Sequence, residues 1–353
     1  MEGYFSTPNR RMFLAGVPVS PRTTSAPMPR RAATVVPAEP SARLIGRSAR
    51  MSVTIDGPAD FPALYRSADR ESERAQRSYL RSLRVRLGAL LIAAFGGALT
   101  FTTAGGFQVG GGLAFLAFAC ALGAELFLAT TSPLTTWYEG RAAAESAKTL
   151  AWRYMVRAEP FEVDAPDVDK QFLAQTYSLL QDLRSISLGT AEPSAHQITD
   201  KMRQVRALDF NQRRQIYLTD RIADQQRWYS EKARWNDRRA RGWVLVSIVL
   251  ETAGLIGGAL TAFGWISFDL LGFLAAAAGG AAAWIEAKQH RNLATAYGIA
   301  SQELASIATE LPKLDSEERW AAFVGQAEEA ISREHTLWRA SRGLTDRFRR
   351  KEG

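Results

Sequence analysis

The chain has 353 residues, with 44 Lys and Arg against 36 Asp and Glu, a net charge of +8 and a mean hydropathy of −0.15. A single cysteine excludes an intrachain disulfide, and the three histidines are scattered without the spacing of a metal site, so no metal or other cofactor is expected. The positive balance is typical of proteins that bind nucleic acid or an anionic membrane surface.

Residues 1–58 are rich in Arg, Pro, Ser and Ala and contain no continuous apolar run. They are therefore not a secretory signal peptide, and we expect a disordered segment. Met51 is an alternative first residue, in which case the preceding residues are an error of gene prediction.

A helix is predicted from about residue 61 into the first apolar stretch. Five arginines along it are spaced four, three, four and three residues apart, which places them on one helix face: Arg70, Arg74, Arg77, Arg81 and Arg84. This face is either solvated or contacts phosphates at a membrane. We take Arg77, Arg81 and Arg84 as candidate interface residues.

Two apolar hairpins, at residues 87–131 and 243–285, dominate the chain. Each half-hairpin has roughly 20 mostly apolar residues, the length that crosses about 30 Å of hydrocarbon. The first hairpin breaks at residues 104–106 and the second at residues 265–269. We predict four spans, at about residues 87–104, 107–129, 243–264 and 268–285.

The helix after the first hairpin carries large and charged side chains at helical spacing: Trp137, Arg141, Glu145, Lys148 and Trp152. On an exposed helix the Arg141–Glu145 and Glu145–Lys148 pairs would each contribute about 0.2–0.5 kcal/mol. Arg141 and Lys148 could also lie over the tryptophan rings. We predict that this face couples the hairpin to its cytoplasmic surroundings.

The chain repeats one plan, because residues 59–160 and 213–343 each contain a basic helix, a hairpin and a following helix that begins near a tryptophan. Residues 161–212 between them read as a helical connector that breaks at residues 188–193. Trp228 and Trp235 on the second approach helix complete the candidate interface. Residues 344–353 form a basic tail.

Charge predicts the topology. Neither hairpin turn contains Lys or Arg, whereas all four outer ends of the predicted spans are rich in them. The positive-inside rule then places both termini and the connector in the cytoplasm. Because many arginines lie close to a predicted span, the lipid bilayer is the expected partner and no nucleic acid is expected.

Three acids lie in or near the predicted spans: Glu125, Glu251 and Asp269. A charge at the centre of a bilayer costs about 2.5–3.5 kcal/mol on insertion scales. Asp269 stands where a helix N-cap is expected. Glu251, roughly 12 Å into its span, either lines a water-filled path or pairs with Arg239 or Arg241.

Glycines four residues apart allow close helix approach in membranes. Gly106 and Gly110 form one such pair, and Gly254 and Gly258 form another. They serve either packing within each hairpin or an interface between subunits. Since four spans are few for the wall of a channel, we expect a homo-oligomer.

No sequence pattern of an active site is present. The chain lacks the Gly-x-x-x-x-Gly-Lys-Ser/Thr phosphate loop, and no Ser/His/Asp or Cys/His set has a plausible frame. An enzyme is therefore not expected.

The run from Trp137 to Tyr154, which closes with Glu159-Pro160-Phe161, resembles the SLATT family, the SMODS- and SLOG-associating two-transmembrane effector domains. Similar stretches occur in the second approach helix, at Tyr217, Arg221 and Trp228, and at residues 330–338. The resemblance covers about residues 60–343 and has the form of two units in tandem.

The resemblance implies an all-α membrane protein, built from two transmembrane hairpins with long cytoplasmic helices. The same resemblance implies that the protein forms pores in the inner membrane of bacteria, as part of prokaryotic antiviral conflict systems. It also implies a separate nucleotide-synthesising or nucleotide-sensing partner that triggers the protein. Two alternatives stay open. One is a non-conducting membrane scaffold or sensor, and the other is a small cation transporter that uses Glu125 and Glu251.

Overall fold

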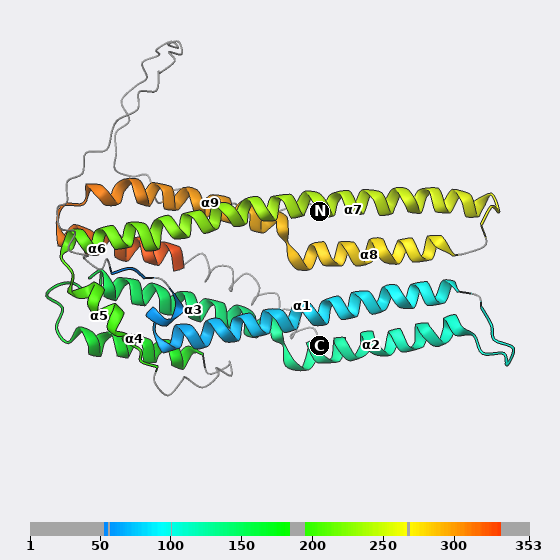
Figure 1. The fold of residues 1–353 in the computed structure, drawn as a ribbon, viewed down its shortest axis with the longest axis horizontal. Coiled ribbons are helices and arrows are strands. Elements are labelled where there is room, and N and C mark those ends of the chain that lie inside the picture. The colour runs from blue at the N-terminus through cyan, green and yellow to red at the C-terminus, as the bar shows by residue number, and fades with distance from the viewer. Residues whose placement is uncertain (1–52, 56, 100, 184–194, 267–268, 333–353) are drawn as a thin grey trace, which may run out of the picture. The chain divides into compact units, whose positions relative to one another are not determined.

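The computed structural model describes residues 53–55, 57–99, 101–183, 195–266 and 269–332. These residues form helices and contain no β-strand beyond an isolated bridge between Thr102 and Gln108 (Figure 1). The predicted all-α class is confirmed. The predictions for residues 1–52, for the break at 188–193 and for the tail at 344–353 lie outside the described residues.

The elements follow one another in two similar series. The first comprises η1 (Pro58–Asp60), α1 (Ala63–Ala98), α2 (Val109–Thr131), α3 (Pro133–Met155), α4 (Val168–Asp182) and α5 (Asp200–Ala207). The second comprises α6 (Phe210–Ile216), the π-helix η2 (Tyr217–Ala223), α7 (Asp224–Ala262), α8 (Leu270–Lys288), α9 (His290–Glu310), η3 (Leu311–Lys313) and helical residues 317–332. The segments α6, η2 and α7 are continuous, so one helix of 53 residues enters the second hairpin.

Both hairpins connect to the following helix by the same backbone break. Ser132 between α2 and α3 has φ 44°, and Gln289 between α8 and α9 has φ 47°. Left-handed backbone is uncommon for residues other than glycine, so its recurrence at equivalent places supports the internal duplication. After each break the chain packs back onto the first helix of its own unit, α3 on α1 and α9 on α7.

Three helices of the described chain are long and apolar enough to cross a membrane: α2, the continuous helix of α6 to α7, and the segment from α8 to η3. Helix α1 is not among them because it ends at Ala98, while Arg84 and Arg86 restrict its apolar part to residues 87–98. Twelve helical residues span only about 18 Å. The predicted span at residues 87–104 is therefore too long, and the four-span count is not confirmed.

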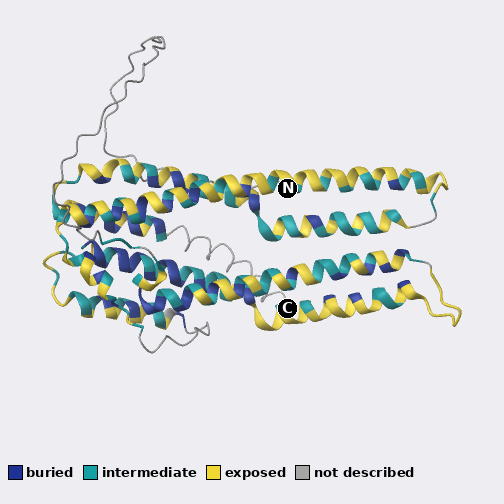
Figure 2. Ribbon diagram, viewed as in Figure 1, coloured by how far each residue is buried: buried dark blue, intermediate teal, exposed yellow. Residues whose placement is uncertain are grey.

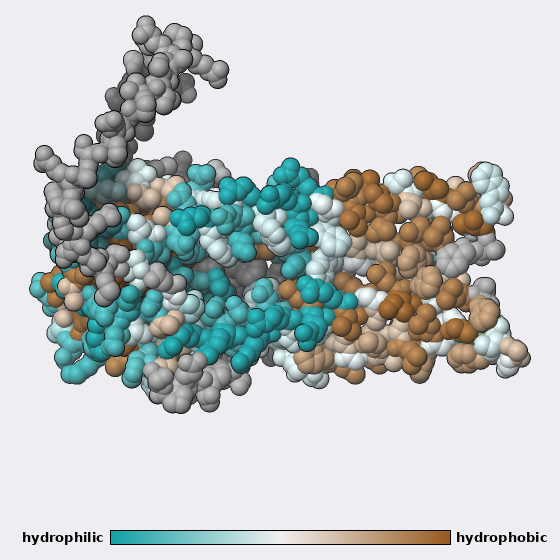
Figure 3. Space-filling view, viewed as in Figure 1, coloured by the Kyte–Doolittle hydropathy of each residue, from teal (hydrophilic) through white to brown (hydrophobic). Residues whose placement is uncertain are grey.

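The hairpin helices keep their apolar side chains on the outside. In the most apolar stretch of α2, only 11% of the residues are buried. The corresponding share is 6% in each of the two other candidate spans. Figure 2 shows mostly exposed and intermediate residues along the hairpins, and Figure 3 shows that the same region is the hydrophobic part of the surface. Lipid is the solvent that suits such a surface.

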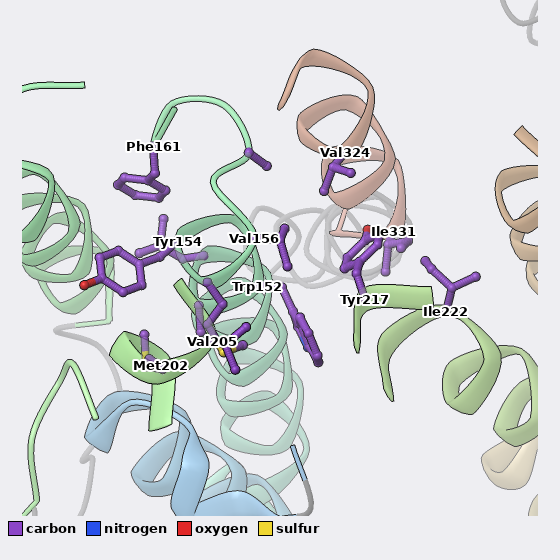
Figure 4. Close-up of a cluster of buried hydrophobic side chains, with 14 of the residues drawn as sticks. Trp152, Tyr154, Val156, Phe161, Met202, Val205, Tyr217, Ile222, Val324 and Ile331 are labelled. Carbon is purple, nitrogen blue, oxygen red and sulfur yellow. The ribbon is translucent and has the colours of Figure 1, made fainter. Parts of the chain in front are cut away.

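The core of the protein lies in the other part of the described chain, where helices of both units meet (Figure 4). Trp152 of α3 and Tyr217 of η2 are fully buried and pack edge to face, with ring centres 5.8 Å apart. Trp320 packs on Tyr217 in the same way, at 5.7 Å. This cluster joins the first unit to the second.

Candidate functional site at the membrane junction

Glu251 has the most unusual surroundings of the three predicted acids. It is exposed on α7, and so are its neighbours Ile248 and Leu255, at 53% and 76%. Residues three and four apart share a helix face, so the carboxylate emerges within an apolar surface. No hydrogen bond or ion pair connects it with another residue in the part of the chain that the structure describes.

The two arginines considered as partners of Glu251 are engaged elsewhere. The Arg239 guanidinium lies 5.3 Å from the centre of the Trp235 ring. Arg241 pairs with Asp237, one turn earlier on the same helix. The predicted pair between Glu251 and either arginine is therefore wrong. No described residue compensates the charge of the Glu251 carboxylate.

The two other acids have partners. Glu125 Oε2 lies 2.8 Å from Arg86 Nη1, which ties α2 to α1 near the base of the first hairpin. The Asp269 carboxylate accepts a hydrogen bond of 2.9 Å from Gly272 N and caps α8, as its position in the sequence predicted. Neither acid faces Glu251 as a second ligand for a cation.

The prediction of the packing glycines is only partly correct. Gly110 of α2 lies directly against the backbone of Gly96 and Leu99 in α1, where any added Cβ would overlap carbonyl oxygens. Gly106 is instead in the hairpin turn, with φ 79°, and contacts no helix. This prediction failed because the apolar stretch continues past the end of α1.

In the second hairpin the close approach occurs at Gly257, whose added Cβ would lie 3.3 Å from Leu270. A Cβ at Gly258 would make only ordinary contact, at 3.7 Å, and a Cβ at Gly254 would meet no atom within 4 Å. Gly254 and Gly258 are therefore not the packing pair. Gly254 lies three residues after Glu251 and leaves open space on this side of α7.

The predicted coupling face on α3 is turned mostly inward, with Glu145 and Trp152 buried and its three other residues half-buried. Glu145 is 4% exposed and Trp152 is 0% exposed. Arg141 pairs with Glu145 at 2.6 Å and approaches Asp69 of α1 at 3.6 Å. The attraction of Glu145 raises the pKa of Arg141 above its ordinary value. The face thus belongs to the interior of the bundle.

Lys148 on the same face lies 5.7 Å from the ring centre of Phe61, not over a tryptophan as predicted. Burial is the main cause that lowers the pKa of Lys148, and nearby Arg221 lowers it further. The candidate arginines of α1 behave differently. Arg77 is exposed and pairs with Glu73 at 3.1 Å, and Arg81 is exposed as well.

A buried ion pair that the sequence did not reveal joins the two ends of the second unit. Arg221 of η2 donates through Nε and Nη2 to the two carboxylate oxygens of Glu328, at 2.8 and 2.7 Å. Tyr217 and Thr149 hydroxyls donate to the same carboxylate, at 2.9 and 3.0 Å. Burial opposes the charge of Arg221, but the attraction of Glu328 holds its pKa above the ordinary value.

Four of the predicted interface residues meet at one place. They line a cavity of about 540 Å³ between the two units, just beyond the bases of the hairpins. Two of them come from α3, Trp137 and Arg141, and two from α7, Trp228 and Trp235. Ligand pockets have volumes of about 300–1,000 Å³. The cavity is lined further by Asp69, Glu73, Tyr138, Lys232, Asn236, Lys288, His290 and Tyr297.

Part of the cavity is held by a buried hydrogen bond of 2.7 Å between His290 Nδ1 and Asn236 Oδ1. Burial, with the positive charges of Lys288 and Arg239, lowers the pKa of His290 below its ordinary value. The ring is therefore neutral at pH 7. The sequence signal that could have identified His290 is its place as a polar residue at the start of the helix after the second hairpin.

Comparisons with known proteins agree with this architecture. A family model described as SMODS and SLOG-associating 2TM effector domain 3 matches residues 62–214, and one described as SMODS and SLOG-associating 2TM effector domain 1 matches residues 217–338. The first match therefore extends through the residues that we had assigned to a connector. Neither the curated proteins nor the solved structures contain a match.

Proposed function

Because the chain belongs to the SLATT family of two-transmembrane effector domains, as two units in tandem, we propose that it is a pore-forming effector of a prokaryotic conflict system. In this proposal the protein oligomerises in the inner membrane and makes it permeable to ions when a trigger arrives. It carries out no chemical reaction of its own.

The observation that carries the proposal is the unpaired carboxylate of Glu251. In a single chain it would face hydrocarbon together with Ile248 and Leu255, at a cost of about 2.5–3.5 kcal/mol if it lay at the bilayer centre. A second copy, or water enclosed between copies, would remove this cost. The open space at Gly254 on the same side of α7 leaves room for such an approach.

The proposed topology places the helical bundle and both termini in the cytoplasm. It is supported by the basic residues at the junction between bundle and hairpins, including Arg84, Arg239 and Lys288, and by hairpin turns without Lys or Arg. The trigger would come from a separate protein that makes or senses a nucleotide. The family description, which names association with SMODS and SLOG, supports this part of the proposal.

Membrane potential in cells that express the full chain tests the proposal. A potential-sensitive dye is read after induction, with the chain alone and with the products of its neighbouring genes. Collapse of the potential is expected, and Glu251→Gln should reduce or alter the ion flux. Asp269→Asn is the matched control, because asparagine also caps a helix and should leave the flux unchanged.

An intact potential, despite confirmed membrane insertion and an active partner, would contradict the pore and favour a non-conducting scaffold. A saturable flux of one defined cation that disappears in Glu251→Gln would favour a transporter instead. Equal flux in the wild type and in Glu251→Gln would remove this residue from the conducting path.

A further inference from the structure

Four basic side chains at the membrane junction have no carboxylate partner among the described residues: Arg84 of α1, Lys232 and Arg239 of α7, and Lys288 of α8. We call them the junction cations. Nearby, Arg86 is paired with Glu125 and Arg241 with Asp237, whereas other exposed arginines of α1, α7 and α9 also have no carboxylate partner among the described residues: Arg81, Arg234, Arg238 and Arg291. The junction cations therefore leave positive charge uncompensated at one place.

Tryptophan rings hold the junction cations close together. Arg84 and Lys288 approach the same ring, Trp284, at 5.5 and 5.6 Å from its centre. Arg239 and Lys232 likewise share Trp235, at 5.3 and 5.9 Å. Cation–π contacts fix the direction of a cation but do not neutralise its charge, so these cations stay available to an anionic ligand.

The cavity between the two units lies next to these cations, and Lys232 and Lys288 form part of its wall. The acids in the same wall are already engaged. Asp69 lies 3.6 Å from Arg141, and Glu73 lies 3.1 Å from Arg77. The remaining lining is largely aromatic, with Trp137, Tyr138, Trp228, Trp235 and Tyr297.

The terminal segments of the chain carry more basic than acidic residues. Residues 1–52 contain eight arginines against two glutamates, and residues 333–353 contain seven basic residues against three acidic ones. An anionic ligand from another molecule would complement the excess of positive charge at the junction cations.

We propose that the junction cavity binds a phosphate-bearing ligand, with the phosphate at Lys232 and Lys288 and the rest of the ligand against the Trp228 and Trp235 rings. Phosphate oxygens are strong acceptors for lysine and arginine, and aromatic walls hold the planar or apolar part of a ligand. Two sources share this chemistry: the headgroup of an anionic phospholipid and a soluble phosphate ester.

The position of the cavity admits both sources. It lies where the hairpins leave the predicted bilayer, and basic pockets between transmembrane helices at this level bind anionic lipid headgroups. It is also part of the bundle that we place in the cytoplasm, which a soluble phosphate ester would reach. Binding here requires no ion conduction, so the proposal can hold or fail apart from the proposed function.

The test uses the full chain in nanodiscs and follows its thermal unfolding and its tryptophan fluorescence. Phosphatidylcholine discs are compared with discs that contain phosphatidylglycerol, and phosphatidylcholine discs are titrated with ATP and with inorganic phosphate. A ligand that binds only the folded protein raises the unfolding temperature. Stabilisation by phosphatidylglycerol alone identifies the lipid source, and stabilisation by ATP identifies the soluble one.

The variant Lys232→Gln/Lys288→Gln should weaken binding at least about tenfold, the scale of a lost hydrogen bond to a charged group. Arg241→Gln is the matched control, because Arg241 is on the same helix but is paired with Asp237, and it should change affinity by less than about threefold. Lys232→Arg/Lys288→Arg should retain binding, which separates lost charge from lost folding. No stabilisation by any of the three probes, or equal losses in Arg241→Gln, would overturn the proposal.

Discussion

Charged side chains have opposite surroundings in the helical bundle and in the apolar hairpins. In the bundle, Arg221 and Glu328 are both fully buried and form a bidentate pair that two hydroxyls complete. In the second hairpin, Glu251 is exposed within an apolar surface and has no partner among the described residues. This buried charge of the bundle is thus paired within one chain, whereas the hairpin lacks a partner for its charge.

The difference shows where a single chain is a stable unit and where it is not. The attraction between the members of a buried ion pair offsets much of their desolvation cost, but an unpaired charge in hydrocarbon remains unfavourable. The bundle should therefore respond to substitution mainly in folding stability. The exposed face of α7 should respond mainly in assembly and ion flux.

The largest effect is expected in the bundle. Arg221→Met removes one member of the buried pair and leaves the Glu328 carboxylate without its main partner, at a cost of about 3–5 kcal/mol. Thermal and denaturant unfolding of the detergent-solubilised protein would measure this loss. The double variant Arg221→Met/Glu328→Leu should recover much of it, since neither charge then remains buried. Equal instability of the single and double variants would contradict the assigned pair.

A smaller effect is expected from packing in the first hairpin. Gly110→Ala would force α1 and α2 apart, because the added methyl overlaps the backbone of Gly96 and Leu99, and overpacking of this kind costs about 1–3 kcal/mol. Gly254→Ala is the control, because nothing lies within 4 Å of its added Cβ. Unfolding of both variants in detergent would compare them. Similar losses would show that Gly110 is not a packing site.

The bundle should also lose stability in alkali. Burial, followed by the hydrogen bond to Asp169, raises the pKa of Tyr154 to about 12, against about 10 in an unfolded chain. The neutral hydroxyl thus contributes stability that is complete below pH 10 and is lost as the pH rises toward 12. The unfolding temperature of Tyr154→Phe should fall less steeply than that of the wild type across this pH range. Parallel curves for the two proteins would contradict the assigned contact.

The smallest effect is expected on the exposed face of α1. Arg77 and Glu73 form a solvent-exposed pair, with side chains 67% and 56% exposed. Arg77→Gln should change the free energy of unfolding by no more than about 0.5 kcal/mol, because such pairs are screened by water and salt. A loss as large as that of Arg221→Met would remove the distinction between buried and exposed charges.

Periodicity and composition alone predicted the two hairpins and the repeated plan, since these depend on long apolar runs and on charge at their ends, and the resemblance to the SLATT family implied the all-α class. The cap at Asp269 was also predicted, because capping is local. The end of α1 at Ala98 was not, since residues after it are as apolar as those before it.

Contacts between distant segments were the part that the sequence could not provide. Arg221 and Glu328 are 107 residues apart and neither stands out in its own helix. The helical spacing of Trp137 to Trp152 placed these residues on one face correctly, but periodicity cannot tell whether that face meets water or another helix. Glu251 was singled out because a charge within an apolar run is anomalous whatever surrounds it.

Photo-crosslinking from the exposed face of α7 tests most directly whether a second copy completes the hairpin. A photoreactive phenylalanine analogue replaces Leu255, one turn from Glu251, and in a second variant replaces Ile299, an exposed aliphatic residue of the bundle. Irradiation of intact membranes should give crosslinked multimers of the chain from position 255 and none from position 299. Lipid adducts alone at position 255, with no multimers, would contradict the account.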